Sequence, residues 1–144
     1  MKNILLILFI FSSFSYGHSA VKGDLMGTWR LVEYAENEKY QDVPNPTPIK
    51  MYMNGEFVII FYLENKMNFN KGRYVIEDGQ VTETILSSST ESLEGEVISF
   101  KPNFMGDKNS FKINIDFGDY QTFERWEKTY CDVVECAKIR TRNN

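Results

Sequence analysis

Hydrophobic and polar residues alternate with a period of two through most of the chain between Leu25 and Tyr130. Such alternation is typical of strands that bury one face, and no long stretch shows the spacing of an amphipathic helix. The clearest case is the segment 110–117, whose apolar face consists of Phe111, Ile113, Ile115 and Phe117. The pattern therefore predicts a protein that is mostly β, with one face of each strand in a core.

Turn signals divide this region into short strands. Asn54-Gly55 and Asp78-Gly79 are dipeptides that form two-residue hairpin turns, and each lies between two alternating segments. The longest interruption, residues 35–48, contains three prolines and is predicted to form a lid or rim loop with room for a short helical turn. The predicted strands are residues 25–34, 49–53, 56–63, 73–78, 80–86, 97–104, 110–117 and 121–130.

The number of strands limits the architecture. Eight to ten antiparallel strands without a covering layer of helices hide their apolar faces either by stacking as two sheets or by closing into a barrel. Alternation alone does not distinguish these two solutions. Closure has the advantage that it removes the sheet edges, and a small barrel leaves room for one modest ligand.

The N-terminal segment has the features of a secretory signal peptide. A positive charge precedes an unbroken apolar run at residues 4–11, and small and polar residues follow it. The run is about half the roughly 20 residues that span a bilayer, so residues 1–20 are predicted to be removed rather than retained as an anchor. Small residues near position 17 or at Ala20 give two alternative cleavage points. Residues 21–144 then form one exported domain, periplasmic or secreted, without a membrane span.

The charge and the cysteines narrow the expected partners and environment. Without Lys2, 15 of the 16 Lys and Arg residues remain against 20 Asp and Glu, a net charge of −5 that argues against nucleic acid and anionic membranes as partners. Cys131 and Cys136 are the only cysteines, and in an oxidising compartment they most simply form a local disulfide ahead of a polar tail. A redox pair or half of a metal site is the weaker alternative, because the spacing is not Cys-x-x-Cys and no histidine follows.

Several short motifs point to a known family. The first predicted strand contains Gly27-Thr28-Trp29, followed by Arg30-Leu31-Val32, and resembles the first-strand signature shared by lipocalins and intracellular fatty-acid-binding proteins. More closely, about residues 25–130 are similar to exported bacterial lipocalin-like domains of uncharacterised function. The other motifs occur in the order these domains share: Gly72-Arg73-Tyr74, Thr82-Glu83-Thr84-Ile85, Leu93-Glu94-Gly95 and Glu124-Arg125-Trp126. The resemblance implies an all-β, lipocalin-like antiparallel up-and-down barrel of eight to ten strands.

The resemblance also implies structural roles at the closed end of the barrel. In these families the tryptophan that follows the first glycine packs across that end, which assigns Gly27 and Trp29. An Arg from the last strand lies over the tryptophan, and Arg125 is the candidate for this cation–π contact. Arg125 shares its strand face with Phe123 and lies opposite Trp126, so both faces carry an aromatic ring and the inward face stays open.

Glu83 is the first candidate for a functional group, because it shares its strand face with Val81 and Ile85. An ionised carboxylate in a core must be paired, hydrogen-bonded or neutralised by a raised pKa. Glu124 joins it in the interior if Trp126 faces inward. The two carboxylates then either satisfy an Arg, a Tyr hydroxyl or backbone groups, or anchor a ligand within an apolar pocket. The candidate wall residues are Phe61, Tyr62, Tyr74 and Trp126.

The remaining chemistry gives little support to catalysis. His18, the only histidine, lies in the predicted signal peptide, and the chain contains no Gly-x-Ser-x-Gly, P-loop or Gly-x-Gly-x-x-Gly motif. A glycosidase would need two carboxylates at a defined separation, which the sequence does not give. No enzyme activity, cofactor or metal is therefore expected. The expected partner is a small apolar or amphipathic molecule in the barrel, unless Phe and Tyr side chains fill it. A protein that docks on the barrel exterior or on the loop 35–48 is the alternative.

Overall fold

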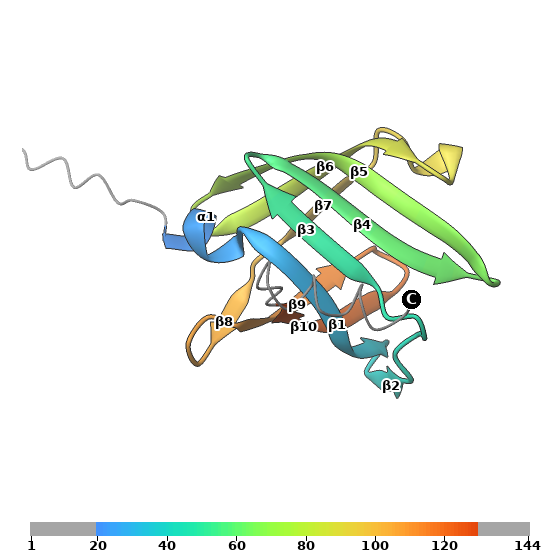
Figure 1. Ribbon diagram of the computed structural model, residues 1–144, viewed down its shortest axis with the longest axis horizontal. Helices are drawn as coiled ribbons and strands as arrows, with labels where there is room; N and C mark the ends of the chain where they lie inside the picture. The colour runs from blue at the N-terminus through green and yellow to red at the C-terminus, as the bar shows by residue number, and fades with distance from the viewer. Residues whose placement is uncertain (1–19, 130–144) are drawn as a thin grey trace, which may run out of the picture.

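The first and the last strand of the described chain lie side by side (Figure 1). The computed structural model describes residues 20–129; the predicted signal peptide up to residue 19 and the predicted Cys131–Cys136 disulfide lie outside them. The elements are α1 (Ala20–Leu25), β1 (Gly27–Glu36), β2 (Lys39–Gln41), β3 (Ile49–Met53), β4 (Glu56–Leu63), β5 (Lys66–Glu77), β6 (Gln80–Ser88), the 3-10 turn η1 (Glu91–Leu93), β7 (Val97–Phe100), β8 (Asn103–Met105), β9 (Ser110–Asp116) and β10 (Gln121–Lys128).

The strands form one antiparallel sheet that closes on itself. β1 pairs with β10 on one side and with β3 on the other, and from β3 to β7 each strand is hydrogen-bonded to the next. β7 pairs with β6 whereas β8 pairs with β9, and only Lys101 and Pro102 separate β7 from β8. These two short strands therefore act as one bent strand that joins the two edges of the sheet. The architecture is an up-and-down antiparallel barrel, as predicted, and not a stack of two sheets.

Two-residue turns set the register of the hairpins. Asn54-Gly55 has φ angles of 53° and 84°, and Asp78-Gly79 has 50° and 78°, so both predicted turns are present. Positive φ angles at both residues also mark turns at 37–38 and 64–65. Neither of these two contains a glycine, which is why the sequence signal for them is weak.

The two additional turns change two predicted boundaries. The turn at 37–38 makes β1 and β2 a hairpin within the segment predicted as a rim loop, so a short strand takes the place of the expected helical turn. The turn at 64–65 lets β5 begin at Lys66 instead of at residue 73. Both errors have one cause, because tight turns without glycine leave no break in the sequence pattern.

Trp29 and α1 close one end of the barrel. The Trp29 side chain is fully buried, and its Nε1 donates a hydrogen bond of 2.8 Å to the carbonyl of Leu25, where α1 ends. Phe111 meets the Trp29 ring edge-on, with 4.7 Å between the ring centroids. Trp29 therefore lies at the floor of the barrel. The predicted strand start at Leu25 was wrong, because the chain turns through α1 before it enters β1 at Gly27 (Figure 1).

On β10 the side chain of Trp126 points into the barrel and that of Arg125 points outward. Trp126 is 1% exposed, whereas Arg125 forms ion pairs on the outer surface with Glu33 at 2.7 Å and with Glu127 at 2.8 Å. Since successive side chains of a strand alternate between its faces, Arg125 cannot reach the ring of Trp29 inside the barrel. The expectation that Arg125 covers Trp29 was wrong for this reason.

Lys128 occupies the position expected for the arginine. It lies two residues after Trp126, on the same face, and its Nζ is 5.1 Å from the centre of the Trp29 ring. Gly27 leaves the space that this lysine needs, because a Cβ at Gly27 would lie 2.8 Å from Lys128 Cε. Gly27 also has a φ of 132°, which residues other than glycine rarely adopt.

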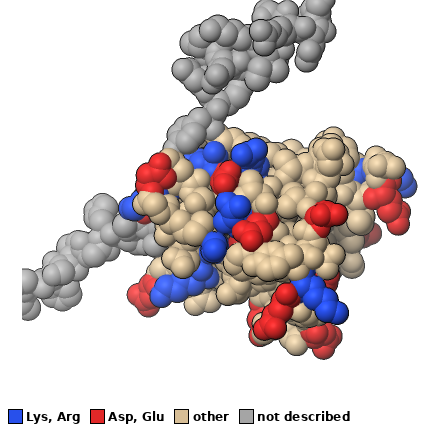
Figure 2. Space-filling model, turned by 90° about the horizontal axis from the view of Figure 1, so that it is seen from below, with Lys and Arg blue, Asp and Glu red and all other residues tan. Residues whose placement is uncertain are grey.

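The outer surface is mixed in charge. Figure 2 shows Lys and Arg side chains interspersed with Asp and Glu on the face that it draws, and no continuous basic stripe crosses that face. Ion pairs on the outside of the barrel follow the same pattern, as between Arg30 and Glu127 at 3.0 Å. Among residues 20–129, no helix has the length and apolar character that a membrane crossing requires.

Candidate functional site

A cavity of about 480 Å³ lies at the end of the barrel opposite to Trp29. It is bounded by the end of β1, the end of β4, the start of β10 and the proline-containing loop before β3. Its volume falls within the range of small-molecule sites. Most of its lining is aromatic or aliphatic, namely Leu31, Tyr34, Ile59, Phe61, Tyr62, Leu63, Phe117, Tyr120 and Trp126, with Pro44 and Pro48 from the loop.

Three polar residues complete this lining. They are Glu36, Thr122 and Glu124, so the described part of the lining contains two acidic residues and no Lys, Arg or His. Thr122 and Glu124 lie on the inner face of β10 with Trp126, two residues apart in each case. Trp126 Nε1 donates a hydrogen bond of 2.8 Å to Glu124 Oε2. The cavity thus combines an apolar wall with a carboxylate held by an indole.

Deeper in the barrel, Glu83 forms a buried ion pair. Lys50 Nζ lies 3.0 Å from each carboxylate oxygen of Glu83, and the Tyr52 hydroxyl donates a further hydrogen bond to the same carboxylate. Lys50 and Glu83 are only 5% and 1% exposed. Burial, with the adjacent Glu83 carboxylate, raises the pKa of Tyr52 well above its usual value. Glu83 is therefore fully partnered by residues of the chain itself.

Aromatic rings surround the ammonium group of this pair. Lys50 Nζ lies 5.3 to 5.8 Å from four ring centres, and the four residues are Tyr52, Phe57, Phe100 and Trp126. Each ring presents a π face that attracts a cation, and this attraction is strongest where water is absent. The rings and Glu83 together compensate for the desolvation of Lys50, so a charged group is stable in the middle of the core.

Glu124 has a less favourable environment than Glu83. Burial is the main reason that its pKa is raised, and the charge of Glu83 raises it further. Lys50 and the hydrogen bond from Trp126 act in the opposite direction without reversing the shift. Lys50 is thus the only cation that the described residues place near both carboxylates, and it contacts Glu83.

Two buried hydroxyl groups have no hydrogen-bond partner among the residues that the structure describes. They are Thr122 Oγ1 and the Tyr74 hydroxyl. Thr122 is part of the cavity lining, whereas Tyr74 packs edge-on against Tyr52 with ring centroids 5.2 Å apart. A buried hydroxyl without a partner is costly, so Thr122 is a polar group of the lining that the described residues leave unsatisfied.

The predicted site residues separate into two groups. Glu124, Trp126, Phe61 and Tyr62 line the cavity, whereas Glu83 and Tyr74 belong to the core beneath it. Three residues of this region were not predicted from the sequence, namely Lys50, Tyr52 and Thr122. The hairpin at Asn54-Gly55 was a usable signal for two of them, because its register places Tyr52 opposite Phe57 and Lys50 opposite Ile59.

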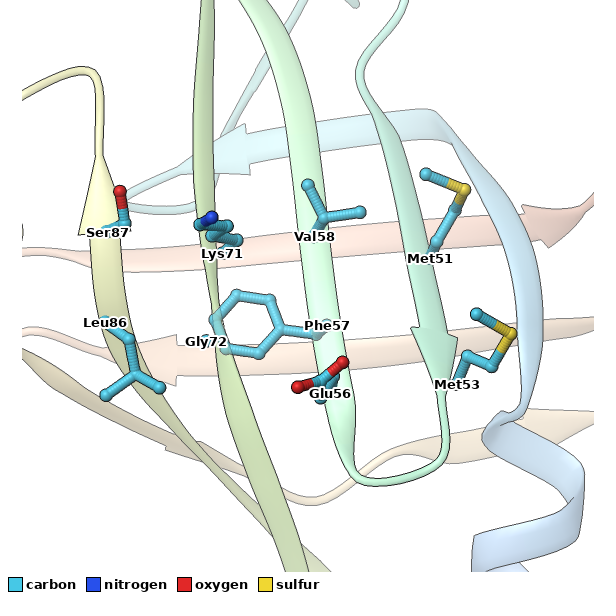
Figure 3. A pocket seen from close by; sticks show the side chains of 9 residues that line it. All are labelled: Met51, Met53, Glu56, Phe57, Val58, Lys71, Gly72, Leu86 and Ser87. Atoms are coloured by element: carbon cyan, nitrogen blue, oxygen red, sulfur yellow. The ribbon is translucent and has the colours of Figure 1, made fainter.

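A second concavity, of about 570 Å³, lies on the outside of the barrel over β3, β4, β5 and β6 (Figure 3). Met51, Met53, Val58 and Leu86 give it an apolar surface, with Glu56 and Lys71 beside them. Figure 3 shows the ring of Phe57 next to Gly72, where β5 has no side chain to cover it. Met53 and Leu86 are 66% and 55% exposed, so this surface carries large apolar groups in contact with solvent.

The fold is that of a lipocalin-like β-barrel. A lipocalin-like protein from Bacteroides uniformis is 17% identical, with a TM-score of 0.55, over 74% of this chain and 100% of that one. An uncharacterized protein from Bacteroides eggerthii is 18% identical, with a TM-score of 0.51, over 73% and 99%. A redesigned β-barrel is 12% identical, with a TM-score of 0.53, over 76% and 96%. No family model and no curated protein matches the sequence. At these identities the similarity establishes the fold alone.

Proposed function

We propose that this protein binds a small amphipathic molecule in the cavity at the open end of the barrel. The observation that carries the proposal is the cavity itself, which has apolar walls and a carboxylate, Glu124, on its inner surface. An apolar wall with a few convergent polar groups is the usual composition of a small-molecule site. Trp29, Phe111 and Lys128 pack together at the other end of the barrel, so side chains close that end.

We further propose that the protein acts outside the cytoplasm, in the periplasm or as a secreted protein. The support is the composition of residues 1–20, which is that of a signal peptide. An exported barrel with an interior site suits a carrier or a scavenger of a poorly soluble molecule. We assign it no catalytic activity, since Lys50 and Tyr52 of the chain itself occupy the Glu83 carboxylate.

Binding of an apolar dye tests this proposal. Nile red, a neutral dye that fluoresces in apolar surroundings, should bind the purified protein with one site and be displaced by amphipathic molecules. The variant Ile59→Trp should lose dye binding because a larger side chain would fill the cavity that Ile59 lines. Ile60→Trp, one residue along β4 and on the opposite face, is the matched control and should bind as the wild type does.

The same pair of variants also shows what would contradict the proposal. If neither the wild type nor Ile60→Trp bound the dye, the cavity would not be a binding site for apolar groups. If Ile59→Trp kept the dye binding of the wild type, the dye would be bound outside the cavity. If both variants lost binding equally, the loss would reflect a destabilised fold, which thermal unfolding followed by circular dichroism would detect.

The exterior concavity supports a second candidate function, docking on another protein. A contiguous apolar patch on the surface of a protein often marks a site of protein–protein interaction. Met53→Lys and Leu86→Lys would disrupt such an interface, because each places a charge within it. Both variants should keep the dye binding of the wild type. A cross-linked partner lost in these two variants and retained in Ile59→Trp would favour docking over ligand binding.

A further inference from the structure

We propose that the ligand of the cavity is a cation: an amphipathic primary amine whose ammonium group binds Glu124 and whose apolar part lies against the aromatic wall. This inference rests on the proposed function and specifies its ligand class. It follows from the charges of the cavity, from the hydrogen bonds that Glu124 lacks, and from the unpartnered hydroxyl of Thr122.

The first observation is the difference between the two inner carboxylates. Glu83 receives the ammonium of Lys50 and the hydroxyl of Tyr52. Glu124 receives one hydrogen bond, from Trp126 Nε1 to Oε2, and its Oε1 accepts none from the residues that the structure describes. An ionised carboxylate has about four lone-pair sites to satisfy, so Glu124 retains unused acceptor capacity beside the cavity.

The second observation is the charge of the cavity and its surroundings. The lining holds Glu36 and Glu124 and no basic residue. Among the described residues Lys50 is the one cation that acts on Glu124, and it is already bound to Glu83. An anionic ligand would add a third carboxylate beside Glu83 and Glu124, whereas a cation would balance the charge of the site.

The third observation concerns the groups around Glu124. Thr122 lies two residues before it on the same face of β10, and its buried hydroxyl has no partner among the described residues. A primary ammonium carries three N–H donors, enough to bind a carboxylate and a hydroxyl at once. The aromatic rings of Tyr34 and Trp126 belong to the same lining and favour a cation over a neutral head group.

The mouth of the cavity suits the apolar part of such a molecule. Phe117 and Tyr120 stack with ring centroids 4.8 Å apart, and both belong to the lining. Phe117 and Tyr120 are 41% and 40% exposed, so they form an apolar entrance at the solvent side of the cavity. A molecule that presents an ammonium to the interior and an alkyl or aryl group to the entrance matches both parts.

Three ligands that differ only in the head group test the proposal: octylamine, octanol and octanoate, each measured by displacement of Nile red from the purified protein. Octylamine should bind about tenfold more tightly than octanol, which corresponds to one charge-assisted hydrogen bond, and octanoate should bind most weakly. Glu124→Gln should reduce the affinity for octylamine about tenfold and leave that for octanol unchanged. Glu64→Gln, with the same change in net charge at an exposed turn, should behave as the wild type.

Octanol binding shows whether each variant is folded, so loss of amine binding is not confused with loss of structure. If Glu124→Gln bound octylamine as tightly as the wild type, the ammonium would not bind Glu124 and the inference would be overturned. Equal affinities for the three ligands would overturn it as well, while the proposed function would stand. If none of the three displaced the dye, both the inference and the proposed binding of amphipathic molecules would fail.

Discussion

Lys50 and Glu83 form an ion pair of 3.0 Å in the core, although β4 and β5 lie between their strands, β3 and β6, in the sheet. Tyr52 completes the coordination of the Glu83 carboxylate, and aromatic rings enclose the Lys50 ammonium. The pair lies directly below the cavity that contains Glu124 and Trp126, so the charges of the core set the electrostatic environment of the proposed ligand site.

Removal of one member of this pair should destabilise the protein strongly. Lys50→Met leaves the Glu83 carboxylate buried without its cation, and the expected loss in the free energy of unfolding is about 3 to 5 kcal/mol. Chemical denaturation with guanidinium chloride measures this loss. The double variant Lys50→Met, Glu83→Leu removes both charges and should recover most of it. A double variant as unstable as the single one would show that packing, and not charge, makes Lys50 necessary.

Gly72 should not tolerate any side chain. It lies at a β-bulge opposite Phe57, and a Cβ there would lie 1.8 Å from the Thr84 carbonyl oxygen and 2.9 Å from the Phe57 ring. Gly72→Ala should therefore lower the free energy of unfolding by about 3 kcal/mol or more, since backbone atoms must move. Gly23→Ala is the control, because nothing lies within 4 Å of its Cβ position. Equal stability of the two variants would contradict the close approach of Gly72 to the Thr84 carbonyl oxygen.

Lys128, and not Arg125, should shield the ring of Trp29. In a Trp126→Phe background Trp29 is the only tryptophan, so its fluorescence can be read alone. Lys128→Ala should increase quenching of this fluorescence by acrylamide and destabilise the fold by about 1 kcal/mol. Arg125→Ala changes the outer surface of β10 and should leave the quenching unchanged. The reverse result would restore the arrangement that the sequence suggested.

Much of the fold was predictable because hairpin turns and alternation carry local information. The bounds of β3 and β4 agree with the predicted strands 49–53 and 56–63, since Asn54-Gly55 fixes where both strands meet. The start of β5 was missed because Glu64-Asn65 turns the chain without a glycine. The helix α1 was missed because six residues are too few to show a helical period.

The site was predictable only in part, because it depends on which face of each strand is inside. On β10 both faces carry an aromatic residue, so the sequence alone does not place Glu124 or Arg125. On β3 the more apolar face, with Met51 and Met53, is the outer one, and the face with Lys50 is the inner one. From the sequence alone, a lysine in a strand is expected to face solvent. Lys50 is buried because it pairs with Glu83, which is distant in the sequence.

The pH dependence of the free energy of unfolding should reveal the raised pKa of Glu124. Its pKa in the folded protein lies above the usual value of 4.5, mainly because of burial, so the folded state holds this proton more tightly than the unfolded state. The free energy of unfolding should therefore fall as the pH rises from 4.5 through the raised pKa, by about 1.4 kcal/mol for each pH unit between these two points. Denaturation at a series of pH values should show this decline in the wild type and not in Glu124→Gln.

Glu127 provides a control of opposite sign. Hydrogen bonds from Arg30 and Arg125 lower its pKa, so its contribution to stability is present above the usual pKa and is lost as the pH falls through the lowered one. Glu127→Gln should leave the decline above pH 4.5 in place.

A bound amine adds a second linkage between pH and stability, because a cation prefers the ionised form of Glu124. Octylamine should thus stabilise the protein more at pH values above the raised pKa than below it. Equal stabilisation on both sides would mean that the ammonium does not bind this carboxylate.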